Sequence, residues 1–304
     1  MLGARHPTVG LVTAPPARAG RGRAPLPNPL AEEAIRRGLM LLQPESARAP
    51  DFLAQFEALR PDLAVVVSYG QILPRAFLTI PRLGCVNLHG SLLPRWRGAS
   101  PVQAAIMAGD AQTGICLQRV AEELDAGEVL AQRATPIAAG ESAPELQARL
   151  AALGAQLLRE FLDGLSEDAS ALPAGVSQDA ARVTHCRKIR KEQAELDWAR
   201  PAADLERFVR AMAGWPVART ALPGGGVLLV HRGRVSRAEA AAVPGTLLEV
   251  GAEIVVACGS GALAIQEAQR EGRARLSAAE LARGARLQVG DRLGVYPGPA
   301  NPPA

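Results

Sequence analysis

Short apolar runs alternate with amphipathic stretches through the first half of the chain. Runs of strand length lie at residues 9–13, 63–67, 85–89, 115–120 and 129–134. Between them, apolar residues recur with helical spacing at residues 30–38, 51–60, 100–109 and 142–161. Strands that alternate with helices predict an α/β domain with an open, mostly parallel, Rossmann-like sheet.

Three of these segments carry stronger local signals. Asp51 is expected to cap its helix, and Ser142 with Glu145 forms a capping box at the start of another. The run Leu-Ala-Val-Val-Val at 63–67 has no polar residue in it. Such continuity is typical of a parallel strand that is buried on both faces of the sheet.

The pattern changes after Gly164. Residues 165–187 mix Ser, Asp, Ala, Pro and Gly without a period, which predicts a linker. One helix is expected at 203–213, and strand-like runs then follow at 217–221, 227–231, 246–250, 254–258 and 262–266. Short strands separated by Gly-rich turns predict a small OB-like β-barrel. We therefore expect an α/β domain at 1–164, a linker at 165–187 and a barrel domain at 188–304.

Charge is distributed unevenly between these parts. The 304 residues hold 34 basic side chains, of which only Lys188 and Lys191 are lysines. A GC-rich genome would explain the excess of arginine, but not its position. Residues 187–304 carry 17 basic and 12 acidic side chains, a net charge of +5, whereas residues 1–186 have a net charge of −1. A basic second half suggests a polyanionic partner held beside a catalytic domain.

The residues best suited to chemistry lie between Asn87 and Asp125. Asn87 and His89 are two positions apart on a predicted strand, so their side chains leave the same face. A Gly/Pro-rich loop follows at 90–98, where ligands of open α/β sheets bind. Asp125 is expected in a turn after another strand. An amide, an imidazole and a carboxylate suit acyl transfer, with Asn87 and His89 facing the developing oxyanion and Asp125 tuning His89 or accepting a proton.

Other chemistries have weaker support. Ser91 and Ser68 lack the Gly-x-Ser-x-Gly turn of hydrolases, and four dispersed histidines have no metal-ligand spacing, so we expect no metal. The sequence lacks the glycine motifs that bind dinucleotides or nucleoside triphosphates. The four cysteines are scattered and contain no Cys-x-x-Cys pair. The sequence also shows no apolar run of membrane-spanning length and no secretory signal. These features predict a cytoplasmic protein.

The segment Asn-Leu-His-Gly-Ser-Leu-Leu-Pro-Arg-Trp-Arg-Gly-Ala-Ser-Pro-Val-Gln at 87–103, with Leu-Asp-Ala-Gly at 124–127, closely resembles the folate-dependent formyltransferases. Further similar segments extend the resemblance over nearly the whole chain. It implies formyl transfer from 10-formyltetrahydrofolate, with catalytic residues Asn87, His89 and Asp125. The family's folate-binding loop matches Ser91, Leu92, Leu93 and Pro94.

The resemblance also implies a partner. The basic barrel and the loop at 14–29, which is rich in Arg, Gly and Pro, favour the members that formylate the methionine amine on initiator tRNA over those that act on nucleotides or nucleotide sugars. Arg21 matches an arginine of the loop that enters the tRNA acceptor stem, and Arg23 and Lys188 are expected to contact tRNA as well. Family members are commonly monomers, so a monomer is expected.

One departure from the family lies at the N-terminus. The family begins with a buried central strand, a glycine-containing turn and a helix before the segment that resembles residues 9–13. About 20 residues of this kind are expected to be missing before Met1, by a start codon assigned too far downstream or by truncation. Neighbouring strands would then keep unpaired backbone groups. The alternatives are a catalytically impaired tRNA-binding protein or a formyltransferase acting on a nucleotide-sugar amine.

Overall fold

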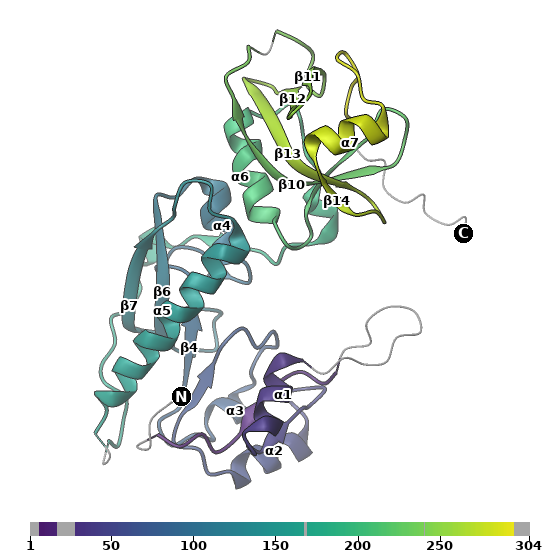
Figure 1. Cartoon of the computed structure of the whole chain (residues 1–304). Helices are drawn as coiled ribbons and strands as arrows, with labels where there is room; N and C mark the ends of the chain where they lie inside the picture. Colours follow the sequence, from purple (N-terminus) through teal and green to yellow (C-terminus); the bar gives the residue numbers. More distant parts are fainter. Residues whose placement is uncertain (1–5, 17–27, 167–168, 240, 295–304) are drawn as a thin grey trace, which may run out of the picture. The chain divides into compact units, whose positions relative to one another are not determined.

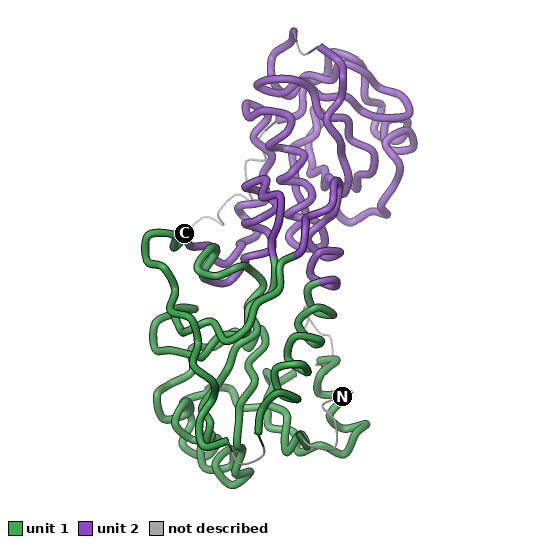
Figure 2. Tube along the Cα trace, turned by 90° about the vertical axis from the view of Figure 1, so that its left-hand side faces the viewer, with its two compact units in different colours: residues 1–97, 114–134, 150–184 green, residues 98–113, 135–149, 185–304 purple. Residues whose placement is uncertain are grey.

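The computed structural model describes residues 6–16, 28–166, 169–239 and 241–294 (Figure 1). Two compact units divide the chain, and each contains several separate segments (Figure 2). Unit 1 comprises residues 1–97, 114–134 and 150–184, and unit 2 comprises residues 98–113, 135–149 and 185–304. Among the described residues, none of the helices combines the length and the apolarity that crossing a membrane requires.

The central sheet has four strands in the order β3 (Ala64–Val66), β4 (Cys85–His89), β6 (Gln112–Arg119) and β7 (Val129–Pro136). β3 and β4 are parallel, whereas β4 and β6 are antiparallel. A separate parallel pair is formed by β1 (Leu11–Val12) and β2 (Leu41–Leu42). The expected α/β class is confirmed, with a sheet that is mixed because β6 reverses direction.

Helices cover this sheet with two apolar clusters. α1 (Pro29–Arg36), α2 (Pro50–Ala58) and α3 (Arg75–Leu78) lie near the N-terminal strands, and α5 (Ala143–Asp163) packs its later turns against β4 and β6. Phe56 stacks on Phe77 with ring centroids 4.4 Å apart, in a cluster that includes Cys85. The expectation that Asp51 caps α2 is wrong, because Ala49 holds the cap position and Pro50 begins the helix.

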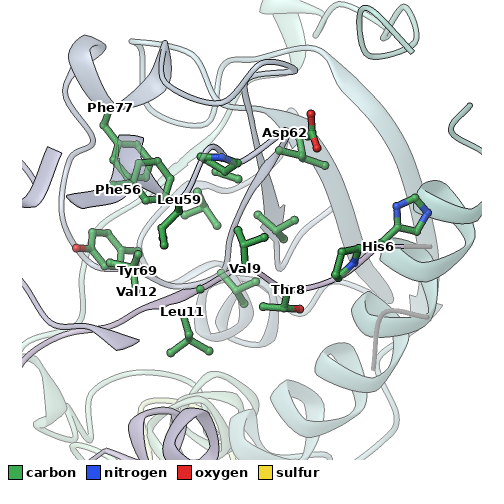
Figure 3. A pocket seen from close by; sticks show the side chains of 18 of the residues that line it. His6, Thr8, Val9, Leu11, Val12, Phe56, Leu59, Asp62, Tyr69 and Phe77 are labelled. Atoms are coloured by element: carbon green, nitrogen blue, oxygen red, sulfur yellow. The ribbon is translucent and has the colours of Figure 1, made fainter. Parts of the chain in front are cut away.

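A cavity of about 470 Å³ lies beside the outer edges of β1 and β3 (Figure 3). We call it the slot; residues 6–12 and 59–67 line it together with side chains that include Leu30, Phe56, Tyr69, Leu73, Phe77 and Leu162. β3 ends its sheet, and β2 is the neighbour of β1 among the described strands. The expectation that residues 63–67 are buried on both faces is therefore wrong: β3 is half-buried, and Val67 is 56% exposed.

The predicted linker packs against the rest of unit 1. Val176 and Val129 exchange two backbone hydrogen bonds of 2.9 Å, and the Arg119 guanidinium donates to the Leu172 and Pro173 carbonyls. The backbone N–H of Trp96 donates to Thr184 Oγ1 at 2.9 Å. A short 3-10 helix, η1 (Ala180–Arg182), lies in the same stretch. We call residues 172–184 the strap.

Unit 2 holds α4 (Pro101–Ala108), which packs against α6 (Ala202–Met212), and an antiparallel sheet. Its strand order is β11 (Leu247–Val250), β12 (Ile254–Ala257), β13 (Ala262–Arg270), β10 (Val227–Ser236) and β9 (Ala218–Ala221), and β14 (Arg275–Ser277) pairs with β13. Arg292 bridges to Thr246, just before β11, and Gly294 bridges to Ala221 of β9, so one segment pairs beside both outer strands of this antiparallel sheet. The short elements β5 (Arg97–Gly98), β8 (His185–Cys186) and η2 (Lys191–Ala194) precede it.

A capping box also begins the last described helix. Ser277 accepts from the backbone N–H of Glu280, and the Glu280 carboxylate accepts from the backbone N–H of Ser277, at the start of α7 (Ala278–Ala285). Leu281 and Ala282 then point into the barrel core. The strand β14, which the sequence interpretation missed, is only three residues long.

Candidate functional site

Asn87 and His89 lie at the carboxyl end of β4, where the strand leads into the 90–98 loop. Their alternation on the strand places both side chains on one face, as expected. Across the antiparallel pairing, Asn87 lies opposite Gln118, and His89 lies opposite Cys116, both on β6. His89 is 5% exposed, so the imidazole is largely shielded from water.

Asp125 meets both residues from the turn after β6. Its Oδ1 lies 3.6 Å from His89 Nδ1 and accepts a hydrogen bond from Asn87 Nδ2 at 3.4 Å. The side chains of His89 and Asp125 are 6% and 9% exposed. The structure thus brings together an amide, an imidazole and a carboxylate, although Asn87 and Asp125 lie 38 residues apart along the chain. We call Asn87, His89 and Asp125 the site triad.

The imidazole of His89 is held on both of its nitrogens. Nε2 lies 2.9 Å from the carbonyl oxygen of Trp96. A carbonyl only accepts, so Nε2 must carry the hydrogen of this bond. Nδ1 is left facing the Asp125 carboxylate. The ring therefore has a fixed orientation, with its second nitrogen directed at a negative charge.

The 90–98 loop is held by a hydrogen bond within it and by one to β6. Ser91 is fully buried, and its hydroxyl donates to the Arg95 carbonyl at 2.5 Å. The backbone N–H of Leu93 donates to Cys116 Sγ at 3.3 Å, and the Leu93–Pro94 peptide is cis. Burial raises the pKa of the Cys116 thiol to about 11, so this acceptor stays neutral. Leu93 is buried, while Leu92 and Pro94 are half-buried, which gives the loop an apolar face.

Two glutamines that the sequence interpretation missed contact the Asp125 turn. Gln118 Nε2 donates to Asp125 Oδ1 at 2.8 Å. Gln178 Nε2 donates to the backbone carbonyls of Asp125 and Gly127, both at 2.8 Å. The pairing of Gln118 with Asn87 would have been the signal for the first. Gln178 lies in the aperiodic strap, where the sequence offers no comparable signal.

The expected nucleic-acid contacts fall in different places. Lys188 is exposed, in an irregular segment of unit 2. Arg21 and Arg23 lie outside the described residues. Within the described part of the chain, no group of three His, Cys, Asp or Glu side chains could hold a metal ion.

This arrangement supplies what acyl transfer to an amine requires. Asn87 offers an N–H donor for a carbonyl oxygen that gains negative charge, beside the buried imidazole of His89. Asp125 offers a carboxylate that can accept a proton or stabilise a cationic imidazole. The fully buried hydroxyl of Ser91 is committed to the Arg95 carbonyl, which argues against its use as a nucleophile.

Comparison of the sequence with known proteins agrees with this chemistry. Residues 3–162 match the family described as formyl transferase, and residues 188–286 match the family described as formyl transferase, C-terminal domain. A protein named methionyl-tRNA formyltransferase from Methylococcus capsulatus is 45% identical over 97% of this chain and 94% of its own length. One of the same name from Xanthomonas campestris is 47% identical over 91% of this chain and 89% of its own length.

Solved structures show the same fold. HypX from Aquifex aeolicus, in complex with tetrahydrofolic acid, aligns with a TM-score of 0.59 at 20% identity, over 84% of this chain and 44% of HypX. An N-formyltransferase from Helicobacter canadensis, in complex with folinic acid and dTDP-3-aminofucose, aligns with a TM-score of 0.59 at 13% identity, over 79% of this chain and 82% of that protein. At these identities the likeness concerns the fold alone.

Proposed function

The chain belongs to the formyl transferase family, and from this premise we propose that it transfers a formyl group from 10-formyltetrahydrofolate to the methionine amine of initiator Met-tRNA. Relatives named methionyl-tRNA formyltransferase at 44–47% identity support this substrate pair. The observation that carries the proposal is the convergence of Asn87, His89 and Asp125 at one buried carboxylate oxygen.

In this reaction the folate supplies a formyl carbon that is bound to nitrogen. Asn87 donates an N–H to the formyl oxygen as negative charge develops there. The His89 imidazole lies beside the same oxygen, and Asp125 Oδ1, 3.6 Å from Nδ1, holds the ring in that orientation. The Asp125 carboxylate also receives the proton that the methionine amine loses as its nitrogen bonds to the formyl carbon. The bond between the formyl carbon and N10 then breaks, and N10 takes up a proton, so that the folate leaves as tetrahydrofolate.

The folate is proposed to bind along the 90–98 loop. Ser91 fixes the loop from within, and Leu92, Leu93 and Pro94 offer an apolar surface beside backbone polar groups. Flat heterocycles bind where apolar side chains and a few oriented polar groups meet. The chemistry of these residues therefore fits a pterin ring next to His89.

The tRNA is proposed to bind through basic groups outside the triad. Residues 187–304 have a net charge of +5, and Lys188 is exposed at the start of this stretch. Arginine forks onto phosphates and base edges, so Arg21 and Arg23 are proposed to contact the acceptor stem. A translation enzyme of this kind is proposed to act in the cytoplasm, as a monomer.

A formylation assay tests the proposal. The protein is incubated with 10-formyltetrahydrofolate and either initiator Met-tRNA or a dTDP-amino sugar, and the formylated product is measured by mass spectrometry. Formyl-Met-tRNA is expected as the product. Formylation of the sugar nucleotide alone would contradict the proposed acceptor. Tight tRNA binding without any formyl transfer would contradict the enzymatic role.

A further inference from the structure

The Asp125 turn needs support from outside itself. Asp125 has a φ of +52°, in the left-handed region that residues other than glycine seldom adopt. Its neighbour Leu124 is 64% exposed, so little apolar burial holds the turn down. A turn of this kind keeps one conformation only when surrounding groups determine it.

Gln178 supplies that support with one amide group. Its Nε2 carries two hydrogens, and it donates to two carbonyls, those of Asp125 and Gly127, each at 2.8 Å. Arg97 Nε donates to Gln178 Oε1 at 2.9 Å. A guanidinium cannot accept a hydrogen bond, so this contact fixes which side of the amide is oxygen and prevents a flipped arrangement.

Gln178 is itself fixed by contacts with other parts of unit 1. Arg97 is 7% exposed and also pairs with Glu123, the residue that precedes Leu124. The strap that carries Gln178 is attached on both sides, through the Val176–Val129 bridge and the Trp96–Thr184 hydrogen bond. Gln178 therefore links the Asp125 turn to the end of the 90–98 loop. The same loop holds His89 through the Trp96 carbonyl.

We propose that Gln178 is a positioning residue for formyl transfer, which keeps the Asp125 carboxylate directed at His89 by holding the backbone on either side of it. The described contacts of Gln178 run to the Asp125 turn, to Arg97 and, at 3.4 Å, to Gln118 Oε1, and not to His89 or Asn87, so it acts through the placement of Asp125. Gln118 completes the arrangement by holding the carboxylate oxygen directly. The expected loss of kcat rests on the proposed function. The expected fixing of the Asp125 turn rests on the hydrogen bonds alone.

The test uses Gln178→Glu, which keeps size and shape but replaces the two donors with an acceptor. Because a misplacement of about 1 Å at a reacting group can reduce the rate about 100-fold, kcat is expected to fall about 10- to 100-fold. The KM for both substrates is expected to stay near its original value. Gln55→Glu, an exposed change of the same kind on α2, is the matched control and is expected to leave kcat unchanged.

A double-mutant cycle separates positioning from a merely structural role. In an Asp125→Asn background, Gln178→Glu is expected to lower kcat no further, because the residue it positions is already altered. Unchanged kcat in the single variant, or additive losses in the double variant, would overturn the proposal.

A readout without activity keeps this test independent of the proposed function. In the absence of substrate, Gln178→Glu is expected to speed amide hydrogen exchange at residues 124–127 relative to Gln55→Glu. If the unsubstituted protein formylates none of the amines, the proposed function fails, and exchange alone decides the positioning role. Unchanged exchange at 124–127 would then overturn it.

Discussion

The site triad and the slot lie in the same unit, but they differ in how completely their buried polar groups are hydrogen-bonded. Around the triad, Asp125 accepts from Gln118 and Asn87, His89 is held by Trp96, and the turn is fixed by Gln178. At the slot, the hydroxyl of Tyr69 and Nε2 of His6 are buried without a hydrogen-bond partner among the described residues. β1 and β3, whose edges face the slot, are only half-buried.

The difference teaches where the stability of unit 1 is concentrated. Buried polar groups are stabilising when all of their partners are present and unfavourable when some are missing. The triad region is of the first kind and the slot region of the second. The part of the sheet that bears Asn87 and His89 is therefore expected to be more rigid than the part that bears β1 and β3.

The largest expected effect is at the triad. Asp125→Asn removes the proton acceptor and the charge that faces His89, and kcat is expected to fall about 1,000-fold, within the usual range for general-base residues. Folate affinity, measured by calorimetry, should change little. Asp62→Asn is the matched change at the slot, where Asp62 is exposed and pairs with Arg82. It should leave kcat within about twofold, since exposed ion pairs contribute little.

The expected effect of Phe56→Ala is smaller and concerns stability. Phe56 lines the slot, whereas Leu117, on β6, is fully buried. Loss of a large core side chain leaves a cavity whose cost depends on how far the surroundings relax. We expect Phe56→Ala to lower the free energy of unfolding by about 3 kcal/mol and Leu117→Ala by about 4 kcal/mol, in urea titrations. The reverse order would show that the slot region is packed as firmly as the triad region.

A third, smaller effect is expected in the alkylation rates of two buried thiols. Burial raises the pKa of Cys85 to about 12 and that of Cys116 to about 11, so at pH 8 neither thiol reacts until its surroundings open. Cys85 packs with Phe56 and Phe77, and Cys116 accepts from the site loop. Alkylation of Cys85, followed by mass spectrometry, is expected to be about tenfold faster. If the thiolate fraction alone set the rate, Cys116, with the lower pKa, would be alkylated faster. Faster labelling of Cys116 would therefore contradict the expected difference in rigidity between the two regions.

Sequence patterns predicted one of these regions better than the other. The spacing of Asn87 and His89 on one strand sufficed to place both on one face, because strand alternation is local. Gln118 required the antiparallel pairing of β4 with β6, and Gln178 required the packing of an aperiodic strap, and neither is encoded in local spacing. The apolar run 63–67 predicted burial on both faces, but burial depends on which strand lies alongside, and β3 ends its sheet.

The smallest expected effect is on the free energy of unfolding when either of two buried hydroxyls is removed. Ser91 is fully buried and donates to the Arg95 carbonyl, so Ser91→Ala removes this hydrogen bond and is expected to lower the free energy of unfolding by about 1 kcal/mol. The Tyr69 hydroxyl is buried without a partner among the described residues, so Tyr69→Phe is expected to be neutral or to stabilise by up to about 1 kcal/mol.

The pH dependence of Tyr69→Phe provides a second measure of the slot. Burial raises the pKa of the Tyr69 phenol, so the unfolded chain ionises at a lower pH than the folded protein does. The folded state therefore loses stability as pH rises through about 10, the ordinary value for tyrosine. Tyr69→Phe removes this loss, and its advantage over the unsubstituted protein should grow between pH 8 and pH 10.5 in urea titrations. An advantage that stays constant with pH would mean that water reaches the hydroxyl through the slot.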